Sequence, residues 1–262
     1  MKSIGIILFL IFTILFAPAA HAEDLDITIV YDNNPYDDRL ETRWGFSCLV
    51  KGLEKTILFD VGGEGRVLLE NMRKLKIDPG TVDIVVLSHI HYDHIGGLSA
   101  FLERNHSVTV FMPVSLPQSV KNRVNNKGAK LVEVRGPVKI CKNAYSTGEL
   151  GIWLKEESLI IKTSKGLVII TGCAHPGVVN IVKKAKEMLK SNVYLVLGGF
   201  HLCWMDPLRI KAIVSEMKKE SVKKVAPCHC SGNLARKLFA NAYGNDFILF
   251  GVGKKIKIKD AF

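Results

Sequence analysis

Short runs of apolar residues recur along the chain, and most of them end at glycine or at a polar residue. Valine, isoleucine and phenylalanine are frequent in these runs, which is typical of buried strands. We predict strands at residues 25–31, 46–50, 56–61, 83–88, 107–112, 131–134, 159–162, 166–172, 193–199 and 222–227.

Three longer segments carry apolar residues at helical spacing. They cover residues 66–77, 180–191 and 208–220 and lie between predicted strands. The first half of the chain is rich in strands, whereas the second half begins with hairpin-like strands and then alternates strand with helix. This order predicts an α/β fold in which sheets pack together and helices cover their outer faces.

The first 22 residues have a different character. Lys2 precedes an apolar stretch over residues 4–16, and small residues follow at Ala20 and Ala22. This pattern predicts a secretory signal peptide that is cleaved after Ala22, leaving a single domain over residues 23–262. An uncleaved N-terminal anchor is the alternative. We therefore expect an exported protein, periplasmic or extracellular, with no membrane span after cleavage.

Composition and charge narrow the function classes. The chain has 262 residues, of which 48% are hydrophobic and 23% charged, a profile that excludes a disordered protein. The net charge is +11, but the lysines are scattered and no long basic run alternates with aromatic residues. We therefore expect no nucleic-acid partner. The surface suits a small-molecule substrate, including an anionic or phosphorylated one.

The six cysteines are widely and irregularly spaced, unlike a small disulfide-bonded scaffold. Cys228 and Cys230 flank His229, but a zinc-binding pair is more often spaced C-x2-C, so we do not assign these two as ligands. For most of the six cysteines we expect the role of small, buried apolar residues.

The densest cluster of candidate ligands lies in residues 87–94, LSHIHYDH. His89 and His91 are two residues apart in an extended segment, so their side chains point to the same side. Asp93 and His94 follow where the chain turns toward a helix, and that turn can aim them at a neighbouring ion. A histidine-rich polar loop is the alternative, but four donors directly after a buried strand favour a metal site.

Other polar residues follow the ends of other predicted strands. Asp60, His175, His201 and His229 each stand at or just beyond an apolar run. In α/β folds, ligands bind beyond the carboxyl ends of strands. These residues are therefore predicted to meet the 87–94 cluster at one edge of the sheets.

The motif H-x-H-x-D-H, preceded by ILFDVGG, resembles the metallo-β-lactamase superfamily. Further segments are similar to its 7,8-dihydropterin-6-methyl-4-(β-D-ribofuranosyl)aminobenzene-5′-phosphate synthase-like branch: YDNN, WGFS, LSHIHYDHIGGL, TGEL, EESL, TGCAHPGVVNIV, GGFHL and PCHCSG. The resemblance spans roughly residues 26–253. It implies an αββα sandwich, in which two mixed sheets are flanked by helices and the metals lie at one edge between the sheets.

The resemblance also implies ligands for one or two divalent ions. They are His89, His91 and His175 for the first ion, and Asp93, His94 and His229 for the second. Zinc is the expected ion, with iron, manganese and magnesium as alternatives. Asp60 is expected to hydrogen-bond to the histidine loop and to orient it.

The chain departs from the superfamily pattern at the end of the strand at 193–199. Many hydrolytic members carry a bridging aspartate there, whereas this chain has Gly198, Gly199, Phe200 and His201. Either the second ion is weak or absent, or His201 completes its ligands. Alternatively, His201 acts as a general acid or donates a hydrogen bond to a substrate phosphate. A structural histidine is the remaining alternative.

These residues favour hydrolysis. A bound divalent metal lowers the pKa of water to about 7 and supplies hydroxide, and Asp93 is placed to orient that hydroxide or to accept its proton. An oxygen-reducing di-iron relative would carry glutamate where this chain has His91. We therefore expect an exported metal-dependent hydrolase of an ester or phosphoester. The alternatives are a transferase like the synthase and a metal-binding module without catalysis.

Overall fold

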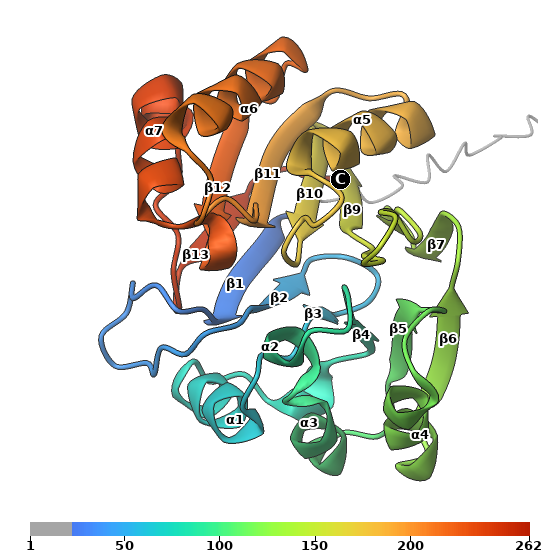
Figure 1. Ribbon diagram of the computed structural model, residues 1–262. Helices are drawn as coiled ribbons and strands as arrows, with labels where there is room; N and C mark the ends of the chain where they lie inside the picture. The colour runs from blue at the N-terminus through green and yellow to red at the C-terminus, as the bar shows by residue number, and fades with distance from the viewer. Residues whose placement is uncertain (1–22) are drawn as a thin grey trace, which may run out of the picture.

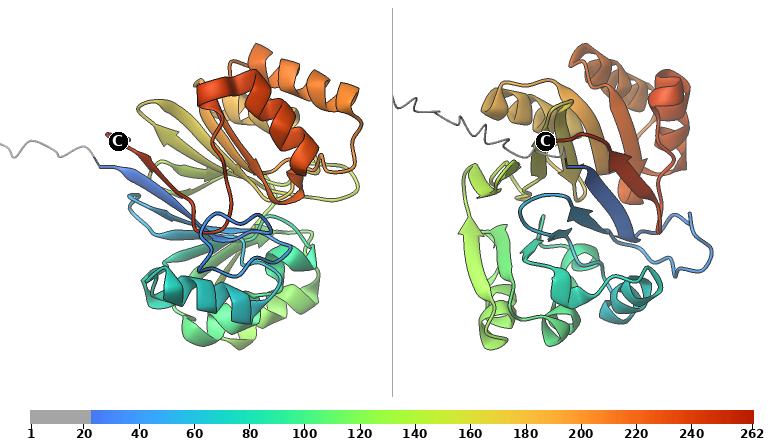
Figure 2. Two further views of the ribbon diagram at one scale, coloured as in Figure 1. Left: turned by 90° about the vertical axis from the view of Figure 1, so that its left-hand side faces the viewer. Right: turned by 180° about the vertical axis from the view of Figure 1, so that it is seen from behind.

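The computed structural model describes residues 23–262, so the predicted signal peptide lies outside the described range. Within this range two β-sheets pack face to face, and helices cover the outer face of each sheet (Figure 1). Figure 2 shows these layers edge-on in its left-hand view. The structure is an αββα sandwich, and the predicted fold class is confirmed.

The first sheet has seven strands, and its edge strand comes from the C-terminal end of the chain. In spatial order the strands are β13 (Lys255–Ile258), β1 (Leu25–Tyr31), β2 (Ser47–Lys51), β3 (Ile57–Phe59), β4 (Ile84–Val86), β5 (Thr109–Pro113) and β6 (Lys130–Val134). Strands β3 to β6 are parallel to one another, and the remaining pairs are antiparallel. The helices on its outer face are α1 (Gly65–Lys74), α3 (Leu98–Arg104) and α4 (Gln118–Asn126).

The second sheet has six strands and is also mixed. In spatial order they are β12 (Lys224–Cys228), β11 (Val193–Gly199), β10 (Gly166–Thr171), β9 (Leu159–Thr163), β8 (Ala144–Ser146) and β7 (Val138–Cys141). Only β10, β11 and β12 run parallel to one another. The helices on its outer face are α5 (Val178–Leu189), α6 (Pro207–Lys219) and α7 (Asn233–Tyr243).

Alternation along the strands divides the side chains between the layers. In β10, Val168 and Ile170 belong to the core between the sheets, whereas Leu167 and Ile169 belong to the core under the helices. All six residues of β10 are buried. A strand covered on both faces reads as a continuous apolar run, which explains why the sequence pattern located this strand.

Every predicted strand and each of the three predicted helices overlaps an observed element. The pattern missed β7, β8, β13, α4 and α7. Several of these are short or polar: β13 reads KIKI with its lysines exposed, and α4 reads QSVKNRVNN. Among residues 23–262, no helix has the length and apolar character needed to cross a bilayer.

Candidate metal centre

The loops that follow β3 and β4 in one sheet and β10, β11 and β12 in the other carry the predicted site residues. The short helix α2 (Tyr92–Ile95) begins directly after His91. Two glycines let this segment pack closely against the loop after β3, since a Cβ on Gly96 would lie 2.1 Å from the Gly63 oxygen and one on Gly97 2.1 Å from the Val61 oxygen. The backbone contact fixes where the histidine motif sits.

The three residues predicted for the first ion lie together. Ligand atoms of His89, His91 and His175 are all within 4.8 Å of one another. His89 is buried, His175 is half-buried and His91 is exposed. This three-histidine cluster therefore has one side open to solvent.

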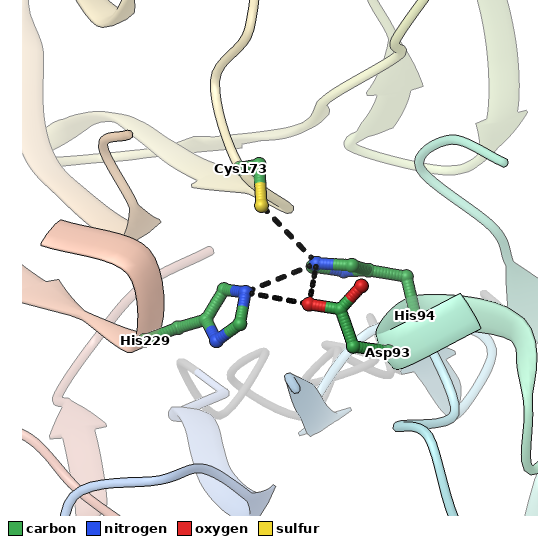
Figure 3. Close-up of side chains that lie close together, drawn as sticks. All are labelled: Asp93, His94, Cys173 and His229. Atoms are coloured by element: carbon green, nitrogen blue, oxygen red, sulfur yellow. Dashed lines mark hydrogen bonds and ion pairs between the residues drawn. The ribbon is translucent and has the colours of Figure 1, made fainter. Parts of the chain in front are cut away.

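The residues predicted for the second ion also lie together, and Cys173 joins them (Figure 3). The nearest carboxylate oxygen of Asp93 is 3.1 Å from His229 Nε2 and 3.5 Å from His94 Nε2. The two Nε2 atoms are 3.2 Å apart, and Cys173 Sγ is 3.2 Å from His94 Nε2. Only the Asp93 side chain keeps partial exposure, and the Trp44 ring packs against His229 with centroids 4.8 Å apart.

These separations suit a tetrahedral ion. In a tetrahedral site the distance between two ligand atoms is about 1.6 times the metal–ligand bond, or roughly 3.3–3.8 Å for zinc bonds of about 2.0–2.3 Å. Four of the six separations in this four-residue cluster are 3.1–3.5 Å, close to that range, and all six are within 4.8 Å. One carboxylate, two imidazoles and one thiol can therefore surround one ion.

The hydrogen bonds of the second cluster fix its imidazole tautomers. His94 Nδ1 lies 2.6 Å from Asp60 Oδ2, and His229 Nδ1 lies 2.9 Å from Asn33 Oδ1. Because both partners are acceptors, each Nδ1 carries a hydrogen and each Nε2 is the nitrogen that faces the cluster. Burial opposes protonation of His229, but its hydrogen bond with Asp93 outweighs burial and raises its pKa. Either a proton on His229 Nε2 or a bound cation therefore lies between the two Nε2 atoms.

The same logic holds in the three-histidine cluster. His175 Nδ1 donates to Glu156 Oε2 at 2.8 Å, and His89 Nδ1 donates at 2.8 Å to Ser88 Oγ, whose hydroxyl donates to Asp60 Oδ2 at 2.7 Å. The Nε2 atoms of His89 and His175 are buried and have no hydrogen-bond partner among the described residues. Such orphaned lone pairs fit a bound divalent ion.

Glu156 is a functional residue that our reading of the sequence missed. Its buried carboxylate accepts hydrogen bonds from the backbone N–H groups of Cys173, Ala174 and His175 at 2.8–2.9 Å, as well as from the His175 ring. Burial opposes its ionisation, but the hydrogen bonds from the ring and the backbone N–H of His175 outweigh burial and lower the pKa of Glu156. Two adjacent acids before an apolar strand, in EESL, were the available signal.

Burial sets the protonation of the central histidines. It lowers the pKa of His89 well below its usual value and that of His94 to about 3, with nearby imidazoles adding to the effect. Both rings are therefore neutral and available as ligands. Burial also raises the pKa of Asp60, which three hydrogen-bond donors from Ser88 and His94 oppose. A cation on His94 would favour the ionised form of Asp60.

His201 lies away from the second cluster. Its ligand atom groups instead with those of Cys173 and Cys230, all within 4.8 Å of one another. Cys173 stands where we considered His201 as the completing ligand. The sequence analysis did not assign Cys230 as a ligand, and the structure brings it next to two other donors.

A cavity of about 820 Å³ opens beside the three-histidine cluster. His175 and His201 line it on the side of the cluster. The remaining wall includes Trp153 from the loop before β9 and Lys183 and Lys184 from α5. Trp153 is almost fully exposed. The cavity therefore combines an apolar surface with positive charge next to candidate metal ligands.

The fold and the two clusters define a metal-binding α/β sandwich protein whose candidate site lies between its sheets. The family model of the metallo-β-lactamase superfamily matches residues 45–182. The chain belongs to this superfamily, whose fold implies divalent metal binding.

Two relatives match over most of their length. The chain is 30% identical over 279 residues to the 7,8-dihydropterin-6-methyl-4-(β-D-ribofuranosyl)-aminobenzene-5′-phosphate synthase of Methanocaldococcus jannaschii, covering 88% of this chain and 95% of the synthase. It is 31% identical to an uncharacterized protein of the same organism, covering 88% of this chain and 100% of that protein. The predicted resemblance to the superfamily and to its synthase-like branch is confirmed.

Solved structures give the same fold. Tm1679, a metal-dependent hydrolase of the β-lactamase superfamily, superposes with a TM-score of 0.77 at 28% identity, covering 90% of this chain and 99% of that chain. The short form of human tRNase Z superposes with a TM-score of 0.59 at 13% identity, covering 88% of this chain and 98% of that chain, which shows the fold alone.

Proposed function

We propose that this protein is an exported metal-dependent hydrolase that cleaves an ester or phosphoester of a small molecule. The observation that carries the proposal is the three-histidine cluster at the wall of the cavity. Three protein ligands leave a coordination position for water or substrate, and a bound metal supplies hydroxide there at neutral pH. Zinc fits the imidazole donors, with iron, manganese and magnesium as alternatives.

Asp93 is the residue that we propose to act on the attacking water. Its carboxylate lies against His229 and keeps partial exposure, whereas the other members of its cluster are buried. Burial opposes its ionisation, but the hydrogen bond from His229 and the positive charge of that ring outweigh burial and lower the pKa of Asp93. An ionised Asp93 can orient an attacking water molecule and accept its proton.

His201 and the lysines are proposed to bind the substrate. The His201 ring lies 4.4 Å from the His175 ring, centroid to centroid, and lines the cavity. A ring N–H there can donate a hydrogen bond to an ester or phosphate oxygen. Lys183 and Lys184 add positive charge, which ion pairs at 3.9 Å with Glu220 and at 3.6 Å with Glu187 partly offset. We propose an anionic substrate on this basis.

The experiment that tests this function is a hydrolase screen on purified protein reconstituted with zinc, iron or manganese. Phosphomonoesters, phosphodiesters, carboxylic esters and lactones form the panel, and metal-stripped protein is the control. We expect turnover of at least one class that disappears on chelation. Absence of hydrolysis for every class, with the clusters shown to be loaded, would refute the proposal and favour a metal-binding module.

A second candidate function is a synthase-like transfer, which the relative from M. jannaschii favours. In that case two substrates would condense at the same cavity, and water would be a poor acceptor. Assaying each active compound with and without an added aromatic amine acceptor separates the two functions. A reporter enzyme fused after Ala22 tests export, since retention in the cytosol would favour the transferase.

A further inference from the structure

A group of sulfur ligands lies beside the two predicted clusters. Cys173, His201 and Cys230 follow β10, β11 and β12, and their ligand atoms lie within 4.8 Å of one another. Both cysteines are free, with exposed fractions of 3% and 1%. Two thiols and an imidazole from three separate segments form a donor set that soft cations prefer.

The end of β11 is shaped around one of these sulfur atoms. A Cβ on Gly199 would lie 2.7 Å from Cys230 Sγ and 2.4 Å from the Gly172 oxygen. A Cβ on Gly198 would lie 2.1 Å from the Thr171 oxygen, and its φ is +116°. No other residue fits at these positions without a shift of the backbone. Gly199 leaves the space that Cys230 Sγ occupies, and Gly198 lets the strand end lie against Thr171.

Three of the nine non-glycine residues with positive φ in the described range lie at or next to these donors. Ala174, His201 and His229 have φ values of 60°, 54° and 45°, in the left-handed region that residues other than glycine seldom adopt. Ala174 follows Cys173, and His229 precedes Cys230. The backbone N–H groups of Leu202 and Cys203 donate to the Cys230 oxygen at 3.1 and 3.2 Å. These bonds hold the loop after β11 against the segment that carries Cys230.

The imidazole of this group has an unused nitrogen. His201 Nδ1 is buried and has no hydrogen-bond partner among the described residues. A buried polar atom without a partner is unfavourable unless a ligand satisfies it. Packing of inert thiols would leave this nitrogen without a partner, whereas a cation bound through Nδ1 would use all three donors.

We propose that Cys173, His201 and Cys230 form a third cation site, which takes a thiophilic divalent ion such as Zn²⁺ or Cd²⁺. This site shares the Cys173 sulfur with the cluster of Asp93, His94 and His229, because a thiolate has lone pairs for two cations. Each thiol releases one proton to solvent when it binds. His201 binds the ion through one nitrogen and presents the other N–H to the cavity.

The test is a Cd²⁺ titration of reduced, metal-stripped protein, followed by thiolate-to-metal charge-transfer absorption in the near ultraviolet and by bound metal per chain. We expect three ions in the unchanged protein. In Cys230→Ser one ion is lost and the absorption falls to about a third, because only the bond from Cys173 to the ion of the second cluster remains of the three thiolate–metal bonds. Cys203→Ser is the matched control, because Cys203 lies on the adjoining loop outside the donor group, and it should leave both readouts unchanged.

His201→Asn is the second variant, because it leaves both thiols in place should Cys230→Ser fail to fold. It should also lose one ion while keeping the circular-dichroism spectrum of the unchanged protein. The same ion count and absorption in both variants as in the unchanged protein would overturn the proposal. A Cys173–Cys230 disulfide in the metal-loaded protein would overturn it as well. His91→Ala should lose hydrolysis without losing charge-transfer absorption, so a failure of the proposed hydrolysis is distinguishable from a failure of this site.

Discussion

The two predicted ligand clusters share one sequence motif but differ in composition and burial. The first has three imidazoles, of which His175 lines the cavity and His91 is exposed to solvent. The second has two imidazoles, a carboxylate and a thiol, and His94 at its centre has an exposed fraction of 0%. Catalytic zinc sites keep three protein ligands and an open position, whereas closed sites with four ligands hold the metal firmly. This difference is the reason for our proposal that the substrate reacts at the first cluster.

The start of α2 produces this difference. His89 and His91 precede the helix in extended chain, whereas Asp93 and His94 belong to its single turn. The change of backbone direction turns His94 inward, where its Nδ1 meets Asp60 at 2.6 Å. One short motif thus supplies an exposed site and a buried one.

Removal of a ligand from the open cluster should have the largest effect. In His91→Ala we expect turnover to fall by more than about a hundredfold, because this loss should exceed the effect of removing an outer hydrogen-bond partner. Bound metal should decrease by one ion per chain. Steady-state kinetics and metal analysis check the two effects.

His106→Ala is the control for that variant, because His106 is an exposed histidine outside every cluster. It should match the unchanged protein in both measurements. Unchanged turnover in His91→Ala would remove the three-histidine cluster from the mechanism and reverse the roles that the comparison assigns.

Removal of a residue that accepts a hydrogen bond from a ligand histidine should have a smaller effect on metal binding, confined to one cluster. Glu156→Gln replaces one of the two carboxylate oxygens by an NH₂ group, which cannot accept the hydrogen of His175 Nδ1. We therefore expect about a ten- to hundredfold loss of metal affinity in the first cluster. Asn33→Ala removes the acceptor of His229 and should weaken only the second cluster. Competition with a chelator measures both affinities. Equal losses at both clusters in either variant would show that the clusters are coupled.

Changes in the cavity wall should alter substrate binding more than chemistry. Lys183→Ala is expected to raise KM several-fold for an anionic substrate with little change in kcat, because a partly screened charge contributes about 1 kcal/mol or less. Lys190→Ala, at the end of α5 outside this cavity, is the control. A neutral substrate should show no change in KM. If Lys183→Ala raised KM equally for a neutral substrate, the lysine would not recognise the charge of the substrate.

The pH dependence of the fold must be separated from that of the clusters. Burial raises the pKa of Glu157 to about 8, from its ordinary value of 4.5. The native state keeps this proton while the unfolded state loses it, so the free energy of unfolding decreases as pH rises between these two values, by at most about 1.4 kcal/mol per pH unit.

Glu157→Gln should therefore reduce the loss of stability between pH 5 and pH 8. Urea unfolding of metal-free protein measures it, and the exposed Glu103→Gln is the control. If the stability curves of Glu157→Gln and of the unchanged protein stay parallel across this range, Glu157 is ionised in the native state.

The sequence located much of the fold because strands covered on both faces must be apolar throughout. It failed at β13, where lysines alternate with isoleucines at a sheet edge, and at α4, which buries only Val120 and Val124. A polar strand or helix that buries only a few residues has a weak hydrophobic periodicity in its sequence. The superfamily match was predictable from H-x-H-x-D-H, because that motif is local.

The sequence by itself determined the alternation of apolar strands, the histidine motif and the strand ends that carry the other donors. Only the tertiary structure decided which donors meet. Cys173 reaches His94 across 79 positions of the chain, and His229 reaches it across 135. Spacing along the chain reports neighbours within one loop or helical turn, whereas the packing of the two sheets sets contacts between distant loops. For that reason only the structure showed that Cys173 and Glu156 lie at the candidate site.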